Sequence, residues 1–410
     1  MKKYFLILYS LLLLGPFWSC KQAPDVDYTE EYRTVYMAKA VDLQDFIFQQ
    51  SLGSNKIFVG ASYGGVDYAP EDIQVQFETD MSLVSQYNDQ YGTNFLPLPL
   101  NNITFVKKDA VIKKGDLQTD ALPIDIDFAG LSTFTSYLLP VKITSVSGGV
   151  PLKETLRTTY FRIEVRSDPV PVKIMSLGKG GTNNDMDKLS QIILDANVDI
   201  ALIREIDKNT TRSGSTSDWP AILAQKLPGY QYVFVPSILA YQGGQYGMAV
   251  YTKYAMSNVQ LYRLVAKGTS QADNTERGPF ATMDLDINGK KLKLATVHTN
   301  TDGPTRATQL GEMIEILGDD DGKPSVLVGN MNANPNGGDS YAALSGIGFG
   351  PVCTTCQPNF SVSNPASWSD MTLYRPSGRF SVVSHVVGTA QQVIGTGTHL
   401  PIFTTLNVYF

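Results

Sequence analysis

The stretch Ser325-Val-Leu-Val-Gly-Asn-Met-Asn332 joins a continuous apolar run to two closely spaced asparagines. A short apolar run that ends at glycine is typical of a strand inside a sheet. Two further strands are predicted before it, at 280–287 and 290–299, and a helix at 305–317. Strands that alternate with helices in this way indicate an α/β sandwich.

The same pattern extends to both sides of this stretch, so we predict one α/β sandwich domain over residues 171–410. The further predicted elements are strands at 172–175, 198–206, 248–251, 381–387 and 400–409, and a helix at 186–196.

The preceding part of the chain, residues 34–166, has a different pattern of short β segments separated by turn residues. This pattern predicts an all-β, antiparallel, immunoglobulin-like sandwich. It contains no cluster of carboxylates, histidines or nucleophiles, so we expect a spacer or a binding module. The predicted strands are 57–59, 73–77, 103–106, 124–128, 137–143 and 158–165.

The N-terminus is typical of an export signal, because two lysines precede the apolar run 4–14. Ser19-Cys20 then matches a bacterial lipoprotein cleavage site. We therefore expect residues 1–19 to be a signal peptide, Cys20 to carry lipid and residues 20–33 to form a linker. The expected location is the outer membrane, on the cell surface, and an ordinary signal peptide with an incidental cysteine is the alternative.

Composition narrows the choice of partners. A net charge of −6 and a pI near 5.2 give no basic footprint for nucleic acid, which we do not expect as a ligand. The remaining cysteines, Cys353 and Cys356, are spaced C-x-x-C, and outside the cytoplasm this spacing predicts a local disulfide. Zinc would need two further ligands, and a redox motif would need a βαβ context.

The N-terminal half resembles a domain of unknown function found at the N-terminus of Bacteroidota surface lipoproteins, next to family 18 glycoside hydrolases. The resemblance rests on Tyr87–Thr93, Leu96-Pro97 and Tyr137–Val141. It implies a glycan-foraging setting and supplies no catalytic residue.

The C-terminal half resembles the endonuclease/exonuclease/phosphatase superfamily, whose members are metal-dependent phosphodiesterases and phosphatases. The segments that carry the resemblance occur in the family's order. They are Ile174–Ser176, Ile203–Asp207, Gly244–Val250, Glu276-Arg277, Ala295–His298, Arg306–Gln309, Val326–Asn332, Val383–Val386 and Thr398–Pro401. The resemblance implies that the predicted α/β sandwich is four-layered.

Four positions keep the residues that this resemblance implies for catalysis. Glu205 corresponds to the metal-binding Glu, preceded by Arg204 where Gln is usual. His298 and His399 correspond to the two catalytic histidines, and Asn332 to the phosphate-binding Asn.

Four other positions depart from the family, mostly at acids. Gly178 stands where Asn is expected, and Asn330 replaces the Asp that activates water. Ser384 stands where an Asp is expected before His385, and Thr398 replaces the Asp before His399. One acid of four remains, so we expect a non-catalytic domain without a cofactor. The alternative is an altered hydrolase that uses Mg²⁺ or another divalent cation.

The three histidines of the chain all fall on family positions, so a three-histidine metal site with His385 is a further alternative. Rings and planar amides in the predicted cleft loops suit sugars, although core or rim packing also explains them. We therefore predict a glycan or glycoconjugate ligand in a nutrient-uptake system. A scaffold that only pairs with an outer-membrane transporter is a further alternative. The candidate ligand-binding residues are Trp219, Tyr241, Gln245, Tyr246, Arg277, Trp368 and Tyr374.

Overall fold

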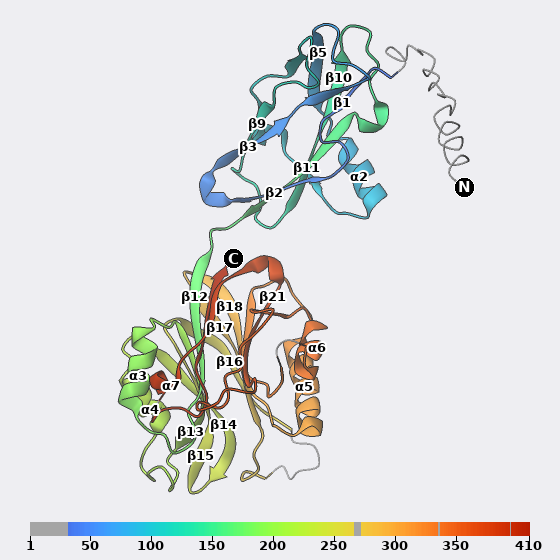
Figure 1. Cartoon of the computed structure of the whole chain (residues 1–410). Coiled ribbons are helices and arrows are strands. Elements are labelled where there is room, and N and C mark those ends of the chain that lie inside the picture. The colour runs from blue at the N-terminus through green and yellow to red at the C-terminus, as the bar shows by residue number, and fades with distance from the viewer. Residues whose placement is uncertain (1–31, 266–271, 335–336, 394) are drawn as a thin grey trace, which may run out of the picture. The chain divides into compact units, whose positions relative to one another are not determined.

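The structure is a computed structural model that describes residues 32–265, 272–334, 337–393 and 395–410. The chain divides into two compact units, and the boundary falls between Arg166 and Ser167. Strands predominate in both units (Figure 1). The predicted two-domain, mostly β organisation is therefore confirmed. The described residues contain no helix that is long and apolar enough to cross a membrane.

The N-terminal unit consists of three sheets. The six-stranded sheet contains β2 (Gln44–Gln49), β5 (Ile73–Thr79), β6 (Leu96–Pro97), β8 (Asp109–Ile112), β10 (Ser136–Val146) and β11 (Thr158–Arg166). The smaller sheets contain β3 (Ser54–Val59), β7 (Ile103–Phe105) and β9 (Leu122–Asp127), and β1 (Thr34–Met37) with β4 (Ala61–Gly64).

Two strand pairs of this unit are parallel, β11 with β2 and β10 with β6. The expectation of a wholly antiparallel arrangement was wrong at these pairs. Parallel neighbours need a long connection, and each of these pairs is separated by several other elements. The immunoglobulin-like description of the unit stays a prediction.

The segment Tyr87–Thr93, on which the N-terminal resemblance rests, forms the end of helix α2 (Leu83–Tyr91) and its cap. Gly92 takes a left-handed conformation with φ of 64°, which ends the helix. The Asn88 side chain then accepts hydrogen bonds from Thr93 and from the Phe95 amide, at 2.7 and 3.0 Å. The motif is therefore a helix stop that fixes the following loop.

The C-terminal unit contains two six-stranded sheets. The first, in spatial order, consists of β14 (Gln231–Tyr241), β15 (Gly244–Thr252), β13 (Ile200–Lys208), β12 (Val170–Gly178), β23 (Ile402–Val408) and β22 (Phe380–Val387). The second consists of β16 (Ala255–Leu264), β17 (Gly278–Ile287), β18 (Lys290–His298), β19 (Ser325–Asn330), β21 (Asp370–Arg375) and β20 (Gly350–Pro351).

Alternate residues of the central strands belong to different apolar cores. On β19, Val326 and Val328 lie in the core that both sheets build, whereas Leu327 packs in a second core with helices α5 (Gly303–Leu317) and α6 (Asp339–Ser345). On β13, Leu202 lies in the shared core. Ile203 packs with α3 (Met186–Asp195) and α4 (Trp219–Gln225). Both faces of these strands are covered, which explains their continuous apolar runs.

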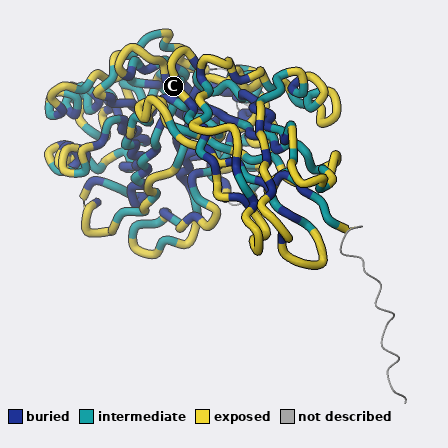
Figure 2. Tube along the Cα trace, turned by 90° about the horizontal axis from the view of Figure 1, so that it is seen from above, coloured by how far each residue is buried: buried dark blue, intermediate teal, exposed yellow. Residues whose placement is uncertain are grey.

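Helices flank the sheets of this unit on two sides, with α3 and α4 on one side and α5 and α6 on the other (Figure 1). Figure 2 shows buried residues mainly on the inner segments of the trace and exposed residues mainly on its outer loops. The fourfold layering predicted for the unit stays a prediction. Helices α3, α4 and α5 start at aspartates: Asp185, Asp218 and Asp302 accept hydrogen bonds from backbone amides of the first turn.

Strands that the sequence pattern did not predict are β1, β2, β4, β6 and β8 in the N-terminal unit and β14, β16, β20 and β21 in the C-terminal unit. β16 carries mixed exposed and half-buried residues, so no clean period marks it. β21 begins with the buried polar residue Asp370, which interrupts the apolar pattern.

Gly329 provides a test of the tight packing between β18 and β19. Its φ is +149°, and a Cβ there would lie 2.0 Å from the backbone oxygen of Val297. We expect Gly329→Ala to lower the free energy of unfolding by roughly 2–4 kcal/mol. In the interior of α5, Gly311 has open space where a Cβ would lie. We therefore expect Gly311→Ala to raise the free energy of unfolding by about 0.5–1 kcal/mol. Urea denaturation measures both, and equal effects would contradict this packing.

Candidate functional site

A cavity of about 550 Å³ lies where the ends of several strands of the two sheets meet. His298 and Asn330 are the last residues of β18 and β19, Glu205 lies within β13, and the other lining residues come from loops. The Glu205 cavity is lined by Glu205, His298, Thr301, Asn330, Asn332, Phe360, Ser367, Trp368, Ser369, Thr398 and His399. Glu205, His298, Asn330, Asn332 and His399, the five positions predicted from the family resemblance, thus lie together, with Trp368 from the predicted ligand-binding set.

Glu205 enters this cavity because strand β13 is irregular there. The register of β13 against β15 shifts between Arg204 and Ile206, so Glu205 is the extra residue of a bulge. Its φ of 59° lies in the left-handed region, which a side chain other than glycine rarely adopts. Bulges of this kind redirect a side chain. The strain at Glu205 therefore turns its carboxylate out of the sheet.

Asn330 and Asn332 build a turn at the end of β19. The Asn330 side-chain oxygen accepts a hydrogen bond from the Asn332 amide at 2.7 Å. The Asn332 side chain donates to the Thr299 carbonyl at 2.8 Å, and Asn332 has a φ of 46°. Both amides are therefore held by the turn that directs them towards the cavity.

Beneath the cavity, the two sheets are joined by a buried ion pair. Arg204 of β13 donates to Asp370 of β21 through Nη2 at 2.6 Å and through Nε at 3.1 Å. Both side chains have no exposed surface. Asp370 also accepts hydrogen bonds from Ser176, Asn359 and Ser369 at 2.6, 2.7 and 3.0 Å.

Asp370 is a site residue that the sequence pattern missed. The sequence predicts one remaining acid at this site, Glu205. The structure brings a second acid, Asp370, beside Glu205 and the two histidines His298 and His399. A Ser-Asp pair at the start of an alternating apolar segment, Met371 and Leu373, was the available signal. Its pairing with Arg204 spans 166 residues, which no local pattern reveals.

Gly178 leaves the space that this arrangement needs. A Cβ there would lie 2.3 Å from Nδ1 of His399 and 2.9 Å from Nη2 of Arg204. The Thr398 and His399 amides both donate to the Gly178 carbonyl, at 3.0 and 3.3 Å. Arg204 can therefore take this position because residue 178 is Gly rather than the Asn that the family resemblance implies.

The two histidines of the cavity are neutral. Burial and the Arg204 guanidinium lower the pKa of His298 to about 3. Burial, and then Arg204, also lower the pKa of His399. The Nδ1 atom of His399 lies 2.9 Å from the Thr398 hydroxyl and 3.9 Å from a Glu205 oxygen. Both rings therefore present neutral imidazole nitrogens to a ligand.

The donor set does not fit a resident hard cation, which prefers several anionic oxygens. Asp370 receives five hydrogen bonds, two of them from Arg204, and these exhaust the approximately four lone-pair sites of a carboxylate. Glu205 is then the one anionic side chain with free capacity among the described lining residues. Within the described ranges, no group of three or more His, Cys, Asp or Glu side chains could hold a metal ion.

Ser384 and His385, where the family resemblance implied an Asp-His pair, lie on the edge strand β22. His385 shares a hydrogen bond of 2.8 Å with the Thr404 hydroxyl. Neither residue is among those that line the Glu205 cavity, so the three histidines do not converge there.

The predicted ligand-binding residues fall into separate places. Tyr241 and Tyr246 pack on the Arg212 guanidinium, with distances of 4.7 and 5.3 Å from its central carbon to the ring centres. Gln245 lies between them in sequence, on β15 opposite Lys208. These residues form a cluster that does not line the Glu205 cavity within the described part of the chain.

Trp219, Tyr374 and Arg277 take other positions. Trp219 begins α4, and its indole donates to the Ser213 carbonyl at 2.9 Å. Tyr374 packs in the core between the sheets, with its ring 5.2 Å from that of Phe380. Arg277 lines a small neighbouring hollow that shares His298 with the main cavity. For Trp219 and Tyr374, core packing therefore describes the environment better than ligand binding does.

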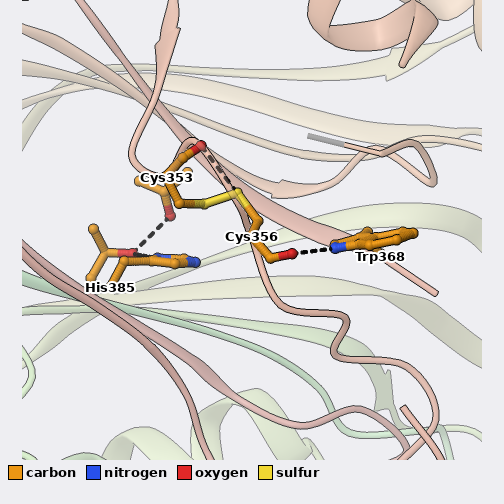
Figure 3. The surroundings of a disulfide bond; sticks show 6 residues. Cys353, Cys356, Trp368 and His385 are labelled. Atoms are coloured by element: carbon orange, nitrogen blue, oxygen red, sulfur yellow. Dashed lines mark hydrogen bonds between the residues drawn. A yellow bond between two sulfur atoms is a disulfide. The ribbon is translucent and has the colours of Figure 1, made fainter. Parts of the chain in front are cut away.

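Cys353 and Cys356 form a disulfide, with their Cα atoms 5.3 Å apart. The Trp368 indole N–H donates to the Cys356 carbonyl at 2.7 Å, as Figure 3 shows. The short disulfide loop therefore fixes the ring that forms one wall of the cavity.

Asp370 makes the stability of the C-terminal unit dependent on pH. Burial alone would raise its pKa, but Arg204, His399 and the hydrogen bonds outweigh burial and hold the pKa below its usual range. A group with a depressed folded-state pKa contributes stability that is present above its unfolded pKa of about 3.9 and is lost as pH falls further.

We therefore expect the unfolding free energy of the wild type to exceed that of Asp370→Asn by about 3–5 kcal/mol near pH 7, since the variant leaves Arg204 buried without its counter-charge. The difference should persist from pH 7 down to about 4 and then shrink as pH falls towards about 2. Urea denaturation across this range measures it. A difference that does not change with pH would contradict the ionised state of Asp370.

Comparisons with known proteins agree with this architecture. The model of the Endonuclease/Exonuclease/phosphatase family matches residues 176–402, more than half of the chain. A model described as an N-terminal domain matches residues 28–150. No curated protein matches the chain.

Solved structures of this fold are similar to the C-terminal unit at low identity. An endonuclease/exonuclease/phosphatase from Beutenbergia cavernae is 18% identical with a TM-score of 0.48, over 58% of this chain and 72% of that one. A family protein from Bacteroides thetaiotaomicron is 15% identical with a TM-score of 0.45, over 58% and 98%. A mannosyl-6-phosphatase from the same species is 14% identical with a TM-score of 0.44, over 57% and 99%. The match of the family model over most of the C-terminal unit shows that the chain belongs to the endonuclease/exonuclease/phosphatase family.

Proposed function

We propose that the C-terminal unit is a non-catalytic binding domain that holds a glycan in the Glu205 cavity. The observation that carries this proposal is the chemistry of the lining. It combines aromatic rings, side-chain amides, hydroxyls and neutral imidazoles with one acidic side chain, Glu205. Sugar hydroxyls both donate and accept hydrogen bonds, and sugar faces pack on rings, so this lining suits a polyhydroxylated ligand.

The charge of the lining disfavours a phosphate ester. The described lining residues include no Lys or Arg, and the two histidines are neutral. Arg204 has no exposed surface and is already paired with Asp370. A phosphate group would therefore meet the Glu205 carboxylate without a compensating cation, and phosphate recognition relies on such cations.

Asn330 argues against hydrolysis at this site. An amide cannot take a proton from water, and the side-chain oxygen of Asn330 already accepts a hydrogen bond from the backbone N–H of Asn332. Loss of a general base of this kind costs about 10²–10⁴ in rate. Thr398 supplies a hydroxyl rather than a carboxylate to His399.

The cellular setting is part of the same proposal. Lipid on Cys20 would anchor the chain in the outer membrane, facing the cell surface, where an outer-membrane transporter would take up the glycan. Cys20 lies outside the described residues, so the proposal that it carries lipid is supported by the sequence pattern alone. The N-terminal unit would then act as a spacer or a second binding module.

A metal-dependent phosphodiesterase or phosphatase is the second candidate, and Asp370 is the observation that favours it. This acid acts electrostatically on His399, as a carboxylate partner of a catalytic histidine would. Assays with Mg²⁺, Mn²⁺ and Ca²⁺ against DNA, phosphodiester lipids and sugar phosphates test this candidate. Turnover that Glu205→Ala abolishes would establish it.

Glycan arrays, followed by calorimetry on the chain without its first 20 residues, test the binding proposal. We expect saturable binding in EDTA, and we expect Trp368→Ala to weaken it at least about tenfold, or ~1.4 kcal/mol, through loss of the ring wall. Trp219→Ala is the matched control, because Trp219 begins α4 and its ring packs in the core beside that helix, away from the cavity. The affinity of this variant should equal that of the wild type.

Two outcomes would contradict the proposal. One is the absence of binding to every host, plant and microbial glycan tested. The other is an equal loss of affinity in both tryptophan variants, which would place the ligand outside the Glu205 cavity.

A further inference from the structure

We propose that Arg204 is the resident cation of this site, and that its guanidinium neutralises the acids that would otherwise attract a divalent metal ion. The inference concerns the charge beneath the cavity and does not depend on which ligand the cavity holds. It goes beyond the loss of family acids, because it gives a covalently attached group the electrostatic role of the ion.

The contacts of Arg204 reach both acids of the site. Nη2 and Nε bind Asp370 at 2.6 and 3.1 Å. Nη1 lies 3.5 Å from Oε1 of Glu205. One positive charge therefore lies between two carboxylates from different sheets, which is where the attraction for a cation would be strongest.

Arg204 has an unused donor that points to the same conclusion. The side chain is completely buried, and Nη1 has no hydrogen-bond partner among the described residues. A buried donor without a partner is costly. Its closeness to Glu205 indicates that charge attraction, rather than a hydrogen bond, holds this end of the guanidinium.

Gly178 makes this position available. Its missing Cβ would lie 2.3 Å from Nδ1 of His399 and 2.9 Å from Nη2 of Arg204, so a larger residue there would displace the guanidinium as well as the His399 ring. The residues 178 and 204 therefore act as a pair. An amide at 178 with a neutral side chain at 204 would release both carboxylates and add an oxygen ligand next to them.

Titration of Mn²⁺ into the mature full-length protein, followed by calorimetry and electron paramagnetic resonance, tests the proposal. The wild type should show no site-specific Mn²⁺ binding. Gly178→Asn/Arg204→Gln should bind one Mn²⁺ at least about tenfold more tightly than the wild type. Arg204→Lys keeps a positive charge and is the matched control, so it should remain without a Mn²⁺ site.

A further substitution locates the gained ion. Adding Glu205→Gln to the double variant should abolish the gained Mn²⁺ binding, because the ion would lose one of the two carboxylates that the double variant releases. The single variant Gly178→Asn should be destabilised by its clashes with His399 and Arg204, and Arg204→Gln should relieve the part of that loss that comes from Arg204. This coupling is measured by a double-mutant cycle in urea.

The following results would overturn the proposal. One is a Mn²⁺ site in the wild type that Glu205→Gln abolishes. A folded double variant without Mn²⁺ binding is another, as is a double variant that stays unfolded with and without Mn²⁺. A double variant that folds only when Mn²⁺ is added would support it, since the ion would then replace the guanidinium in stability as well as in charge.

Discussion

The ion pair between Arg204 and Asp370 is the interaction on which the rest of the C-terminal site depends. It joins β13 of one sheet to β21 of the other with no exposed surface on either side chain. Removing water from two charges is expensive, and good geometry with further hydrogen bonds is needed to offset it. Ser176, Asn359 and Ser369 supply those hydrogen bonds. The pair therefore fixes how the two sheets approach one another under the cavity.

This constraint extends to the residues that face a ligand. Arg204 directly precedes Glu205, so holding the guanidinium also holds the bulge that turns the Glu205 carboxylate outward. The same guanidinium helps to keep His298 and His399 neutral by lowering the pKa of each ring. Burial and this one buried cation together therefore keep the pKa values of both rings low. A family fold built around a metal ion is, in this chain, organised around an arginine.

Sequence reasoning predicted those parts of the fold whose residues are determined locally. Strands such as β19 have both faces covered, and their continuous apolar runs mark them without reference to the rest of the chain. The positions of Glu205, Asn332 and His399 followed from a family resemblance. Asp370 could not be found in this way, because its partner is far away in sequence and its strand starts with a buried charge. Trp219 and Tyr374 were selected as aromatic residues, but only packing decides which rings reach a cavity.

The measurement that tests this account most directly is anomalous X-ray diffraction from crystals of the protein soaked in Mn²⁺. The account predicts no anomalous peak beside Glu205 in the wild type, with the Arg204 guanidinium remaining on Asp370. A strong peak within coordination distance of both Glu205 and Asp370, with Arg204 displaced, would contradict it and would identify the site as a metal centre.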